Sequence, residues 1–295
     1  MMLKSIRSLS VLLLALLLAA CGSVTSQAAS TPTLPPPPTA APTTAIPATP
    51  APLPTALATP QPVRPAHSID LGTGRWLVTQ AYTGQDQKRN YAIQTQWPVV
   101  EGMTTPQIEQ FNLAAQTLVS DTLDNFQQQI TEPLPEPGGF IYVNYHLISA
   151  SNGLLSILFD VSTYTGGAHP NTVHVPLNFD VNTGKALTFD DIFKPGVDVV
   201  NTLAVIATDE LTHTNRLMFP EGATPKPENY QVWNFDLNNL IITFDPYQVM
   251  PYANGPQTVA IPYFELMDQL KPDSPLADFW QLTKRCTEST PAQCK

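Results

Sequence analysis

The sequence predicts an α+β domain with a mainly antiparallel sheet, a long amphipathic helix and a second helix packed on it. Several segments alternate apolar and polar residues, which is typical of strands with one solvated face. Two others repeat apolar residues at helical spacing. The helices are grouped rather than strictly alternating with the strands, and this order favours an antiparallel sheet.

Residues 1–20 have the composition of a signal peptide. Lys4 and Arg7 give a basic start, and the apolar run that ends at Ala20 is too short to span a bilayer. The run closes with LAAC, which resembles the lipobox of bacterial lipoproteins and implies cleavage before Cys21 and lipidation of its thiol. We therefore expect an extracytoplasmic chain that is lipid-anchored to the cell membrane. The alternative is an ordinary cleavage site beside an incidental cysteine.

Residues 21–65 are expected to form a disordered, proline-rich linker after the lipidated cysteine. Of the 35 residues from Thr31 to Pro65, 13 are proline, and most of the others are Thr or Ala. Proline removes backbone donors and favours extended polyproline conformations, so this composition forms no packed core. Fully extended, the segment reaches roughly 100 Å, enough to hold a domain away from the membrane.

Residues 66–295 are long enough for one large domain, or for two subdomains near 66–170 and 171–270 with a tail behind them. All 24 acidic residues lie in this part, against 11 of the 14 Lys and Arg, which gives a formal charge near −13. An acidic surface argues against a nucleic-acid ligand and suits a cationic partner.

The three cysteines divide between the anchor and the tail. Once Cys21 is lipidated, Cys286 and Cys294 remain as an even pair in an oxidising compartment. We expect these two to form a disulfide that constrains the C-terminal tail. The alternative is that both are free thiols.

The long helix is predicted from Pro106 to about Ile130. Thr105 is a suitable N-cap, and proline is tolerated in the first turn. Apolar residues then recur at helical spacing, namely Ile108, Phe111, Ala115, Leu118, Val119, Phe126 and Ile130. The second helix is predicted from Val197 to about Thr212, with an apolar face formed by Val199, Leu203, Ile206 and Leu211.

The strands alternate instead. In LLSILFDVSTY, every second residue from Leu155 to Val161 is apolar, while Asp160 lies on the polar face. TVHVPLNFDV alternates in the same way, with His174 on its polar face, and NTGK after it is a turn signal. The pair Asn238 and Asn239 joins VWNFDL to LIITFD as a hairpin.

The loop YTGGAHPN between the first two of these strands is the candidate binding site. Gly166 and Gly167 provide the backbone freedom that a sharp reversal needs, and Asn171 can bond its own backbone. Tyr164 and His169 place an aromatic ring and a polar tip beside an exposed turn, which suits recognition of a sugar or a partner protein. The alternative is a loop whose residues serve only the reversal.

Neither a catalytic site nor a metal site is predicted, and no cofactor is expected. His169 and His174 are five residues apart, which places strand residues on opposite faces, and Pro170 disfavours a chelating helix. TFDD at 188–191 is similar to a run in metal-dependent polysaccharide deacetylases, but Ile192 stands where that family has glycine. A short helical turn capped by Asp190 or Thr188 is the simpler explanation. No nucleophile elbow, P-loop, dinucleotide fingerprint or cysteine-rich zinc pattern is present.

Two stretches carry a family resemblance that covers most of residues 88–266. They are SILFDVSTYTGGAHPNTVHVPLNFDVNTGKALTFDDIF and NFDLNNLIITFDPYQVMPYANGPQTVAIPY. Both resemble the extracytoplasmic domain shared by the anti-sigma-V factor, which is a lysozyme receptor, and the N-terminal region of peptidoglycan deacetylase C. The sharpest elements are YTGGAHPN and the DPYQVMPYANGPQTVAIPY segment.

The resemblance implies binding at the cell wall, with a glycan, a lysozyme-like cationic protein or a wall protein as the partner. We do not expect this chain to hold the spanning helix of the anti-sigma factor or the catalytic barrel of the deacetylase. The expected function is therefore a stand-alone, lipid-anchored binding or sensing module that is not an enzyme. The alternative is a hydrolase or deacetylase that acts on cell-wall polymer.

Overall fold

The computed structural model describes residues 66–281. The expected signal peptide, the linker, Cys21 and the Cys286–Cys294 pair lie outside these residues, so lipidation and the disulfide stay predictions. Between residues 66 and 281, no helix is both long and apolar enough to cross a bilayer.

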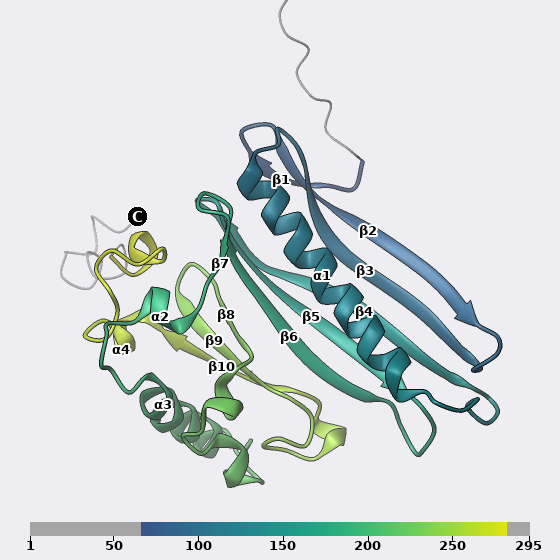
Figure 1. Cartoon of the computed structure of the whole chain (residues 1–295). Helices are drawn as coiled ribbons and strands as arrows, with labels where there is room; N and C mark the ends of the chain where they lie inside the picture. The colour runs from purple at the N-terminus through teal and green to yellow at the C-terminus, as the bar shows by residue number, and fades with distance from the viewer. Residues whose placement is uncertain (1–65, 282–295) are drawn as a thin grey trace, which may run out of the picture. The chain divides into compact units, whose positions relative to one another are not determined.

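Seven strands form one sheet in the order in which they follow along the chain (Figure 1). They are β1 (Ile69–Gly72), β2 (Arg75–Asp86), β3 (Tyr91–Gly102), β4 (Gly139–Ser151), β5 (Leu154–Tyr164), β6 (Asn171–Asp180) and β7 (Lys185–Ala186). Neighbouring strands are antiparallel except β3 and β4, which run parallel because α1 (Pro106–Gln129) crosses over between them. The predicted α+β class with a mainly antiparallel sheet is confirmed.

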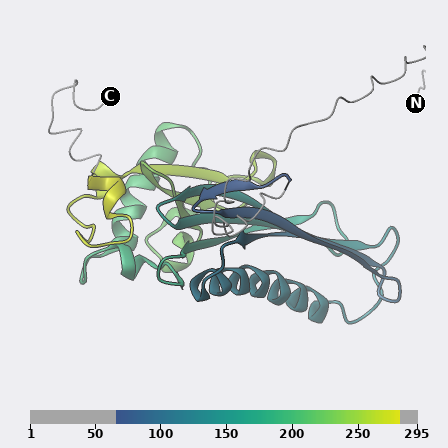
Figure 2. The same cartoon turned by 90° about the horizontal axis from the view of Figure 1, so that it is seen from above.

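The helix α1 lies against one face of this sheet, as Figure 2 shows. Thr105 is its N-cap and accepts a hydrogen bond from the backbone N–H of Ile108 at 3.4 Å, with Pro106 in the first turn as predicted. The buried side of the helix consists of Ile108, Phe111, Ala115, Val119 and Phe126. Phe111 packs edge-on against Phe179 of β6, with ring centroids 5.4 Å apart. This contact belongs to a continuous apolar core between helix and sheet.

Three more strands form a smaller antiparallel sheet. They are β8 (Trp233–Phe235), β9 (Asn239–Phe244) and β10 (Gln257–Pro262), with β9 in the middle. The β8–β9 connection is the predicted hairpin. In its turn, the Asp236 carboxylate accepts from the backbone N–H groups of Asn238 and Asn239, both at 2.7 Å, which holds the reversal.

Short helices cover the smaller sheet and close a second apolar core. They are α2 (Phe189–Ile192), α3 (Val199–His213), α4 (Tyr263–Leu266) and the 3₁₀ turns η1 (Pro220–Ala223), η2 (Pro227–Tyr230) and η3 (Tyr252–Asn254). The second predicted helix is α3. It begins at Val199 because the Asp198 carboxylate accepts from the backbone N–H of Asn201 at 3.1 Å and so caps the first turn.

The two sheets meet through a buried polar network. Ser156 of β5 donates to the Asn178 amide oxygen at 2.7 Å, and the Asn234 amide of β8 donates to the Ser156 hydroxyl at 2.9 Å. The Asn178 amide in turn donates to the Trp233 carbonyl at 2.7 Å. These directional bonds fix how β8 lies against β5 and β6, and so position the segment that follows β9. The division suggested near residue 170 stays a prediction; β5 and β6, on either side of it, are paired in one sheet.

Candidate functional site

The loop predicted as the binding site joins β5 to β6 just beyond the paired residues Thr163 and Asn171. Gly166 and Gly167 both have φ of 111°, a conformation that side chains with a Cβ rarely adopt, so the reversal itself requires glycine. A Cβ at either position would meet no atom within 4 Å, so crowding plays no part. Asn171 is exposed at the start of β6.

Tyr164 continues a row of aromatic rings on the sheet face opposite α1. Its hydroxyl donates to the Gly167 carbonyl at 2.9 Å, which ties the ring to the loop. The ring stacks with Phe140 of β4 at a centroid distance of 5.8 Å, and Phe140 stacks with Tyr142 at 4.2 Å. Tyr142 is exposed, so the row reaches solvent.

His169 connects the loop to the segment between β9 and β10. Its Nδ1 lies 2.8 Å from the Pro170 carbonyl, which can only accept, so the neutral ring carries its proton on Nδ1. Nε2 then accepts from the Tyr247 hydroxyl at 3.1 Å. The imidazole also stacks on Tyr252, with centroids 3.8 Å apart and planes 19° apart. His169 and Tyr247 are both exposed, so this aromatic cluster forms part of the surface.

His174 is buried, although the sequence places it on the polar face of its strand. Its Nδ1 lies 2.5 Å from Asp245 Oδ1, and its backbone N–H donates to the same oxygen at 3.0 Å. On the other side, its Nε2 lies 3.5 Å from Oδ1 of Asp160, its direct partner across β5 and β6. Both ring nitrogens of His174 therefore face carboxylates.

Asp160 is shared between two histidines. Its second oxygen lies 2.7 Å from Nε2 of His146 on β4, a side chain that is 60% exposed. A row of alternating histidine and aspartate side chains therefore runs from the surface to the segment after β9. It consists of His146, Asp160, His174 and Asp245. A general base needs a ring nitrogen directed at a substrate or nucleophile. Both ring nitrogens of His174 are engaged by carboxylates, so this buried side chain links Asp160 of β5 to Asp245 in the segment after β9.

The structure brings together two stretches that sequence reasoning treated separately. YTGGAHPN and DPYQVMPYANG meet through the pair His169 and Tyr247, while Asp245 of the second stretch holds His174. Sequence reasoning missed Asp245, Tyr247, Tyr252, Asp160 and His146 as site residues. The signal available was the family resemblance, whose two sharpest elements are these same stretches.

TFDD forms a helix cap with Thr188 as the N-cap, as predicted, but the acidic residue that takes part is Asp191 and not Asp190. The Asp191 carboxylate accepts from both the backbone N–H and the hydroxyl of Thr188, each at 2.8 Å, at the start of α2. Ile192 and Phe193 are buried behind it. Among the described residues, no group of three or more His, Cys, Asp or Glu is arranged to hold a metal ion.

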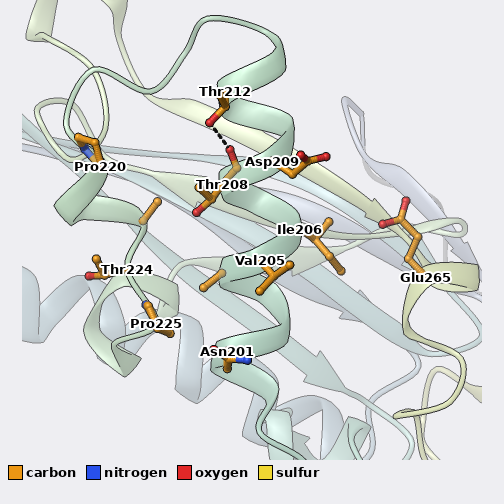
Figure 3. A pocket seen from close by; sticks show the side chains of 12 residues that line it. Asn201, Val205, Ile206, Thr208, Asp209, Thr212, Pro220, Thr224, Pro225 and Glu265 are labelled. Atoms are coloured by element: carbon orange, nitrogen blue, oxygen red, sulfur yellow. Dashed lines mark hydrogen bonds between the residues drawn. The ribbon is translucent and has the colours of Figure 1, made fainter.

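A separate groove of about 760 Å³ runs between α3 and η1 (Figure 3). Val205 and Pro220 contribute apolar surface, and Asp209 and Glu265 contribute carboxylates. Figure 3 shows Thr212 turned back onto α3, where its hydroxyl donates to the Thr208 carbonyl at 2.6 Å. None of the described side chains that line the groove is cationic, so it presents negative charge beside apolar surface.

Two family models match the chain. Residues 85–172 match the model described as deacetylase PdaC, and residues 190–264 match the model described as a protein of unknown function (DUF3298). The contact between His169 and Tyr247 joins the two matched regions.

Three relatives share part of the chain. It is 33% identical over 134 residues to the peptidoglycan-N-acetylmuramic acid deacetylase PdaC of Bacillus subtilis, a match that covers 44% of this chain and 29% of PdaC. It is 23% identical over 150 residues to the immunogenic protein MPT64 of Mycobacterium tuberculosis, covering 49% of this chain and 66% of MPT64. It is 28% identical over 100 residues to the esterase Rv3036c of the same organism, covering 33% of this chain and 44% of the esterase. The chain therefore spans less than two thirds of the length of each relative.

Among solved structures, a member of the DUF3298 family from Bacteroides fragilis has a similar fold. Its TM-score is 0.52 at 15% sequence identity, over 70% of this chain and 97% of that one. At this identity the likeness concerns the fold alone.

Proposed function

Because residues 85–172 match the deacetylase PdaC model and residues 190–264 match the DUF3298 model, we propose that this chain belongs to an extracytoplasmic domain family shared by these proteins and is a binding module of the cell wall without catalytic activity of its own. The relative with the highest identity of the three is a deacetylase named for peptidoglycan N-acetylmuramic acid. A non-enzymatic module related to such an enzyme would bind the cell wall or sense its state.

The observation that carries this proposal is the position of His174. Catalysis by a histidine needs one ring nitrogen directed at a substrate or nucleophile. Here the two nitrogens face Asp245 and Asp160, and the ring is buried. His169 has its nitrogens directed at Pro170 and Tyr247. Neither histidine is arranged as a general base.

Recognition is supported by the surface that these contacts create. The loop is tied to the segment between β9 and β10 by stacking and hydrogen bonding, while Tyr247 and His169 stay exposed. A surface that is already ordered loses less entropy when it binds. Aromatic rings with polar tips suit a glycan, whereas the net charge near −13 of residues 66–295 and the carboxylates beside α3 suit a lysozyme-like cationic protein. In the proposal, a lipid on Cys21 anchors this module outside the cytoplasm.

The test is binding of the purified full chain to insoluble peptidoglycan and to immobilised lysozyme. We expect His169→Ala to weaken binding about tenfold, or about 1.4 kcal/mol, with the thermal midpoint lowered by only about 2–4 °C. His213→Ala is the matched control, because this exposed histidine contacts only its own helix at Asp209. If the native chain binds neither material, the proposal is wrong; if His169→Ala unfolds the domain, His169 is a structural residue.

A hydrolase or deacetylase that acts on wall polymer is the second candidate. It is favoured by the esterase among the relatives and by the exposed His146, which pairs with Asp160 at the surface end of the row that includes His174. The test is release of acetate from peptidoglycan and hydrolysis of p-nitrophenyl acetate. Turnover by the native chain that disappears in a folded His174→Gln variant would replace the binding-only proposal.

A further inference from the structure

A cavity of about 370 Å³ lies at the end of the seven-stranded sheet opposite the loop that carries His169. β5 begins here at Leu154 and runs for 11 residues to Tyr164, which is roughly 35 Å at the usual rise of a strand. The β1–β2 turn, the β4–β5 turn and the residues after β6 meet around the cavity. None of the residues discussed as the candidate binding site lines it.

Hydrogen bonds between these segments hold the walls of the cavity. Asn152 and Gly153 form the β4–β5 turn with φ of 54° and 78°. The Asn182 amide donates to the Asn152 carbonyl at 2.9 Å, and the Val181 N–H donates to the Gly153 carbonyl at 2.8 Å. A Cβ on Gly153 would lie 2.5 Å from the Asn182 amide, so glycine allows this close approach. The cavity is therefore preformed.

Arg75 at the start of β2 lines this cavity. Its Nε has no accessible surface and no hydrogen-bond acceptor among the described residues. A buried donor without an acceptor costs about 1–3 kcal/mol, and more when the group is charged. Such a group is satisfied when a ligand supplies the acceptor.

The electrostatics of the cavity favour an anion. Arg75 is the one ionisable side chain among the described residues that line it, in a chain that is otherwise strongly acidic. Ile108, in the first turn of α1, also lines the cavity, so the positive end of that helix dipole lies nearby. Glu109 follows on α1 but is not a lining residue.

The rest of the lining is mixed in character. Val100, Leu155 and Val181 give apolar walls, while Thr73 and Ser151 provide hydroxyl groups. The volume is at the lower end of the usual range for small-molecule sites, about 300–1,000 Å³. It suits one sugar ring or a dipeptide.

We propose that this cavity binds the carboxylate of a small, partly apolar ligand, with Arg75 as its counter-ion. A guanidinium group pairs with a carboxylate through two parallel N–H···O bonds, a geometry that a neutral amide or ester cannot reproduce. The source of the ligand rests on the proposed function. In peptidoglycan, such a carboxylate occurs at the C-terminus of the peptide stem, and on the lactyl group of muramic acid wherever no stem is attached.

The experiment is calorimetric titration of the full chain with two matched pairs of probes. N-acetylmuramic acid is compared with N-acetylglucosamine, which lacks the lactyl carboxylate. N-acetyl-D-alanyl-D-alanine is compared with its C-terminal amide. We expect the acid of at least one pair to bind at least ten times more tightly than its neutral partner, and the pair that responds identifies the source.

Arg75→Met tests the counter-ion and Lys88→Met is its control. Both remove one positive charge, but Lys88 is exposed and does not line this cavity. Arg75→Met should abolish binding of the acid while the thermal midpoint stays equal or rises, because an unpaired buried donor is removed. Lys88→Met should bind like the native chain.

Other outcomes overturn the inference. It is wrong if the native chain binds acid and neutral probes equally or not at all, or if Arg75→Met retains binding. A chain that binds insoluble peptidoglycan equally well with and without Arg75, and binds neither acid, removes the cavity proposal and leaves the proposed function intact. A chain that binds an acid through Arg75 but binds neither peptidoglycan nor lysozyme supports the cavity proposal and overturns the proposed function.

Discussion

Tyr230 is almost fully buried in the core under the smaller sheet, and its hydroxyl donates to the Ala223 carbonyl at 2.6 Å. Burial raises the pKa of Tyr230 to about 12, whereas an unfolded tyrosine titrates near 10. Because the folded pKa lies above the unfolded one, the stabilisation by the neutral hydroxyl is complete below about pH 10. It is lost as the pH rises from about 10 to about 12.

Tyr230→Phe should therefore change stability in two ways. At pH 7 the variant should lose about 1–2 kcal/mol, because the Ala223 carbonyl loses its donor. Between pH 9.5 and 11 its stability should fall less steeply than that of the native chain. Urea unfolding across this pH range measures both effects, with Tyr82→Phe on the exposed part of β2 as the control. Equal slopes for native chain and variant would contradict the assignment.

Single residues also show the limits of reading the site from sequence. Gly166 and Gly167 could be predicted because a sharp reversal depends on local backbone conformation, and both have φ of 111°. His174 was placed by alternation on a polar face that was expected to be solvated. It is buried because the segment after β9 covers that face and brings Asp245 against the ring. Strand alternation says which face a residue is on, but not what covers the face.

The pairing of β6 with the segment after β9 can be tested through His174 and Asp245. Asp245→Ala leaves the ring and the backbone N–H of His174 without their acceptor, so we expect a loss of about 1–3 kcal/mol. His174→Ala removes the other partner, and the double variant completes the cycle. Because the two residues share their bonds, we expect a coupling energy of at least about 1 kcal/mol. Additive effects in urea unfolding would show that the contact contributes nothing specific.

The contribution of α1 depends on its buried side. Phe111 is fully buried against Phe179, whereas Leu113 on the same helix is 56% exposed. Phe111→Ala should cost about 3–5 kcal/mol, because it removes apolar contacts and leaves a cavity. Leu113→Ala should change stability by less than about 0.5 kcal/mol. Chemical denaturation of the two variants measures the difference, and similar losses would mean that the helix is packed differently.

Lipid anchoring is predicted at the scale of the whole chain, and the prediction is tested at Cys21. Two acyl chains hold a protein at a membrane far more firmly than one, so Cys21→Ala should move the protein from the membrane fraction to the soluble fraction and prevent cleavage after Ala20. Cys286→Ala is the matched control and should stay with the membrane. Full retention of Cys21→Ala in washed membranes together with cleavage after Ala20 would show that the lipobox interpretation is wrong.

The sequence by itself determined the features that depend on local chemistry. The limits of α1 follow from Thr105, Pro106 and the spacing of apolar side chains, all of which act within a few residues. The β8–β9 hairpin follows in the same way from Asn238 and Asn239. The N-cap of α2 at Thr188 also depends only on neighbours along the chain.

Tertiary structure alone decided the features that depend on distant segments. His174 and Asp245 are 71 residues apart in the chain, and His169 and Tyr247 are 78 apart. No local pattern links such residues, because their contact depends on how the smaller sheet packs on β5 and β6. In the sequence, nothing distinguishes Arg75 from any other residue at the start of a strand. Its isolation at the cavity arises because turns from β1, β4 and β6 meet around it without bringing a carboxylate.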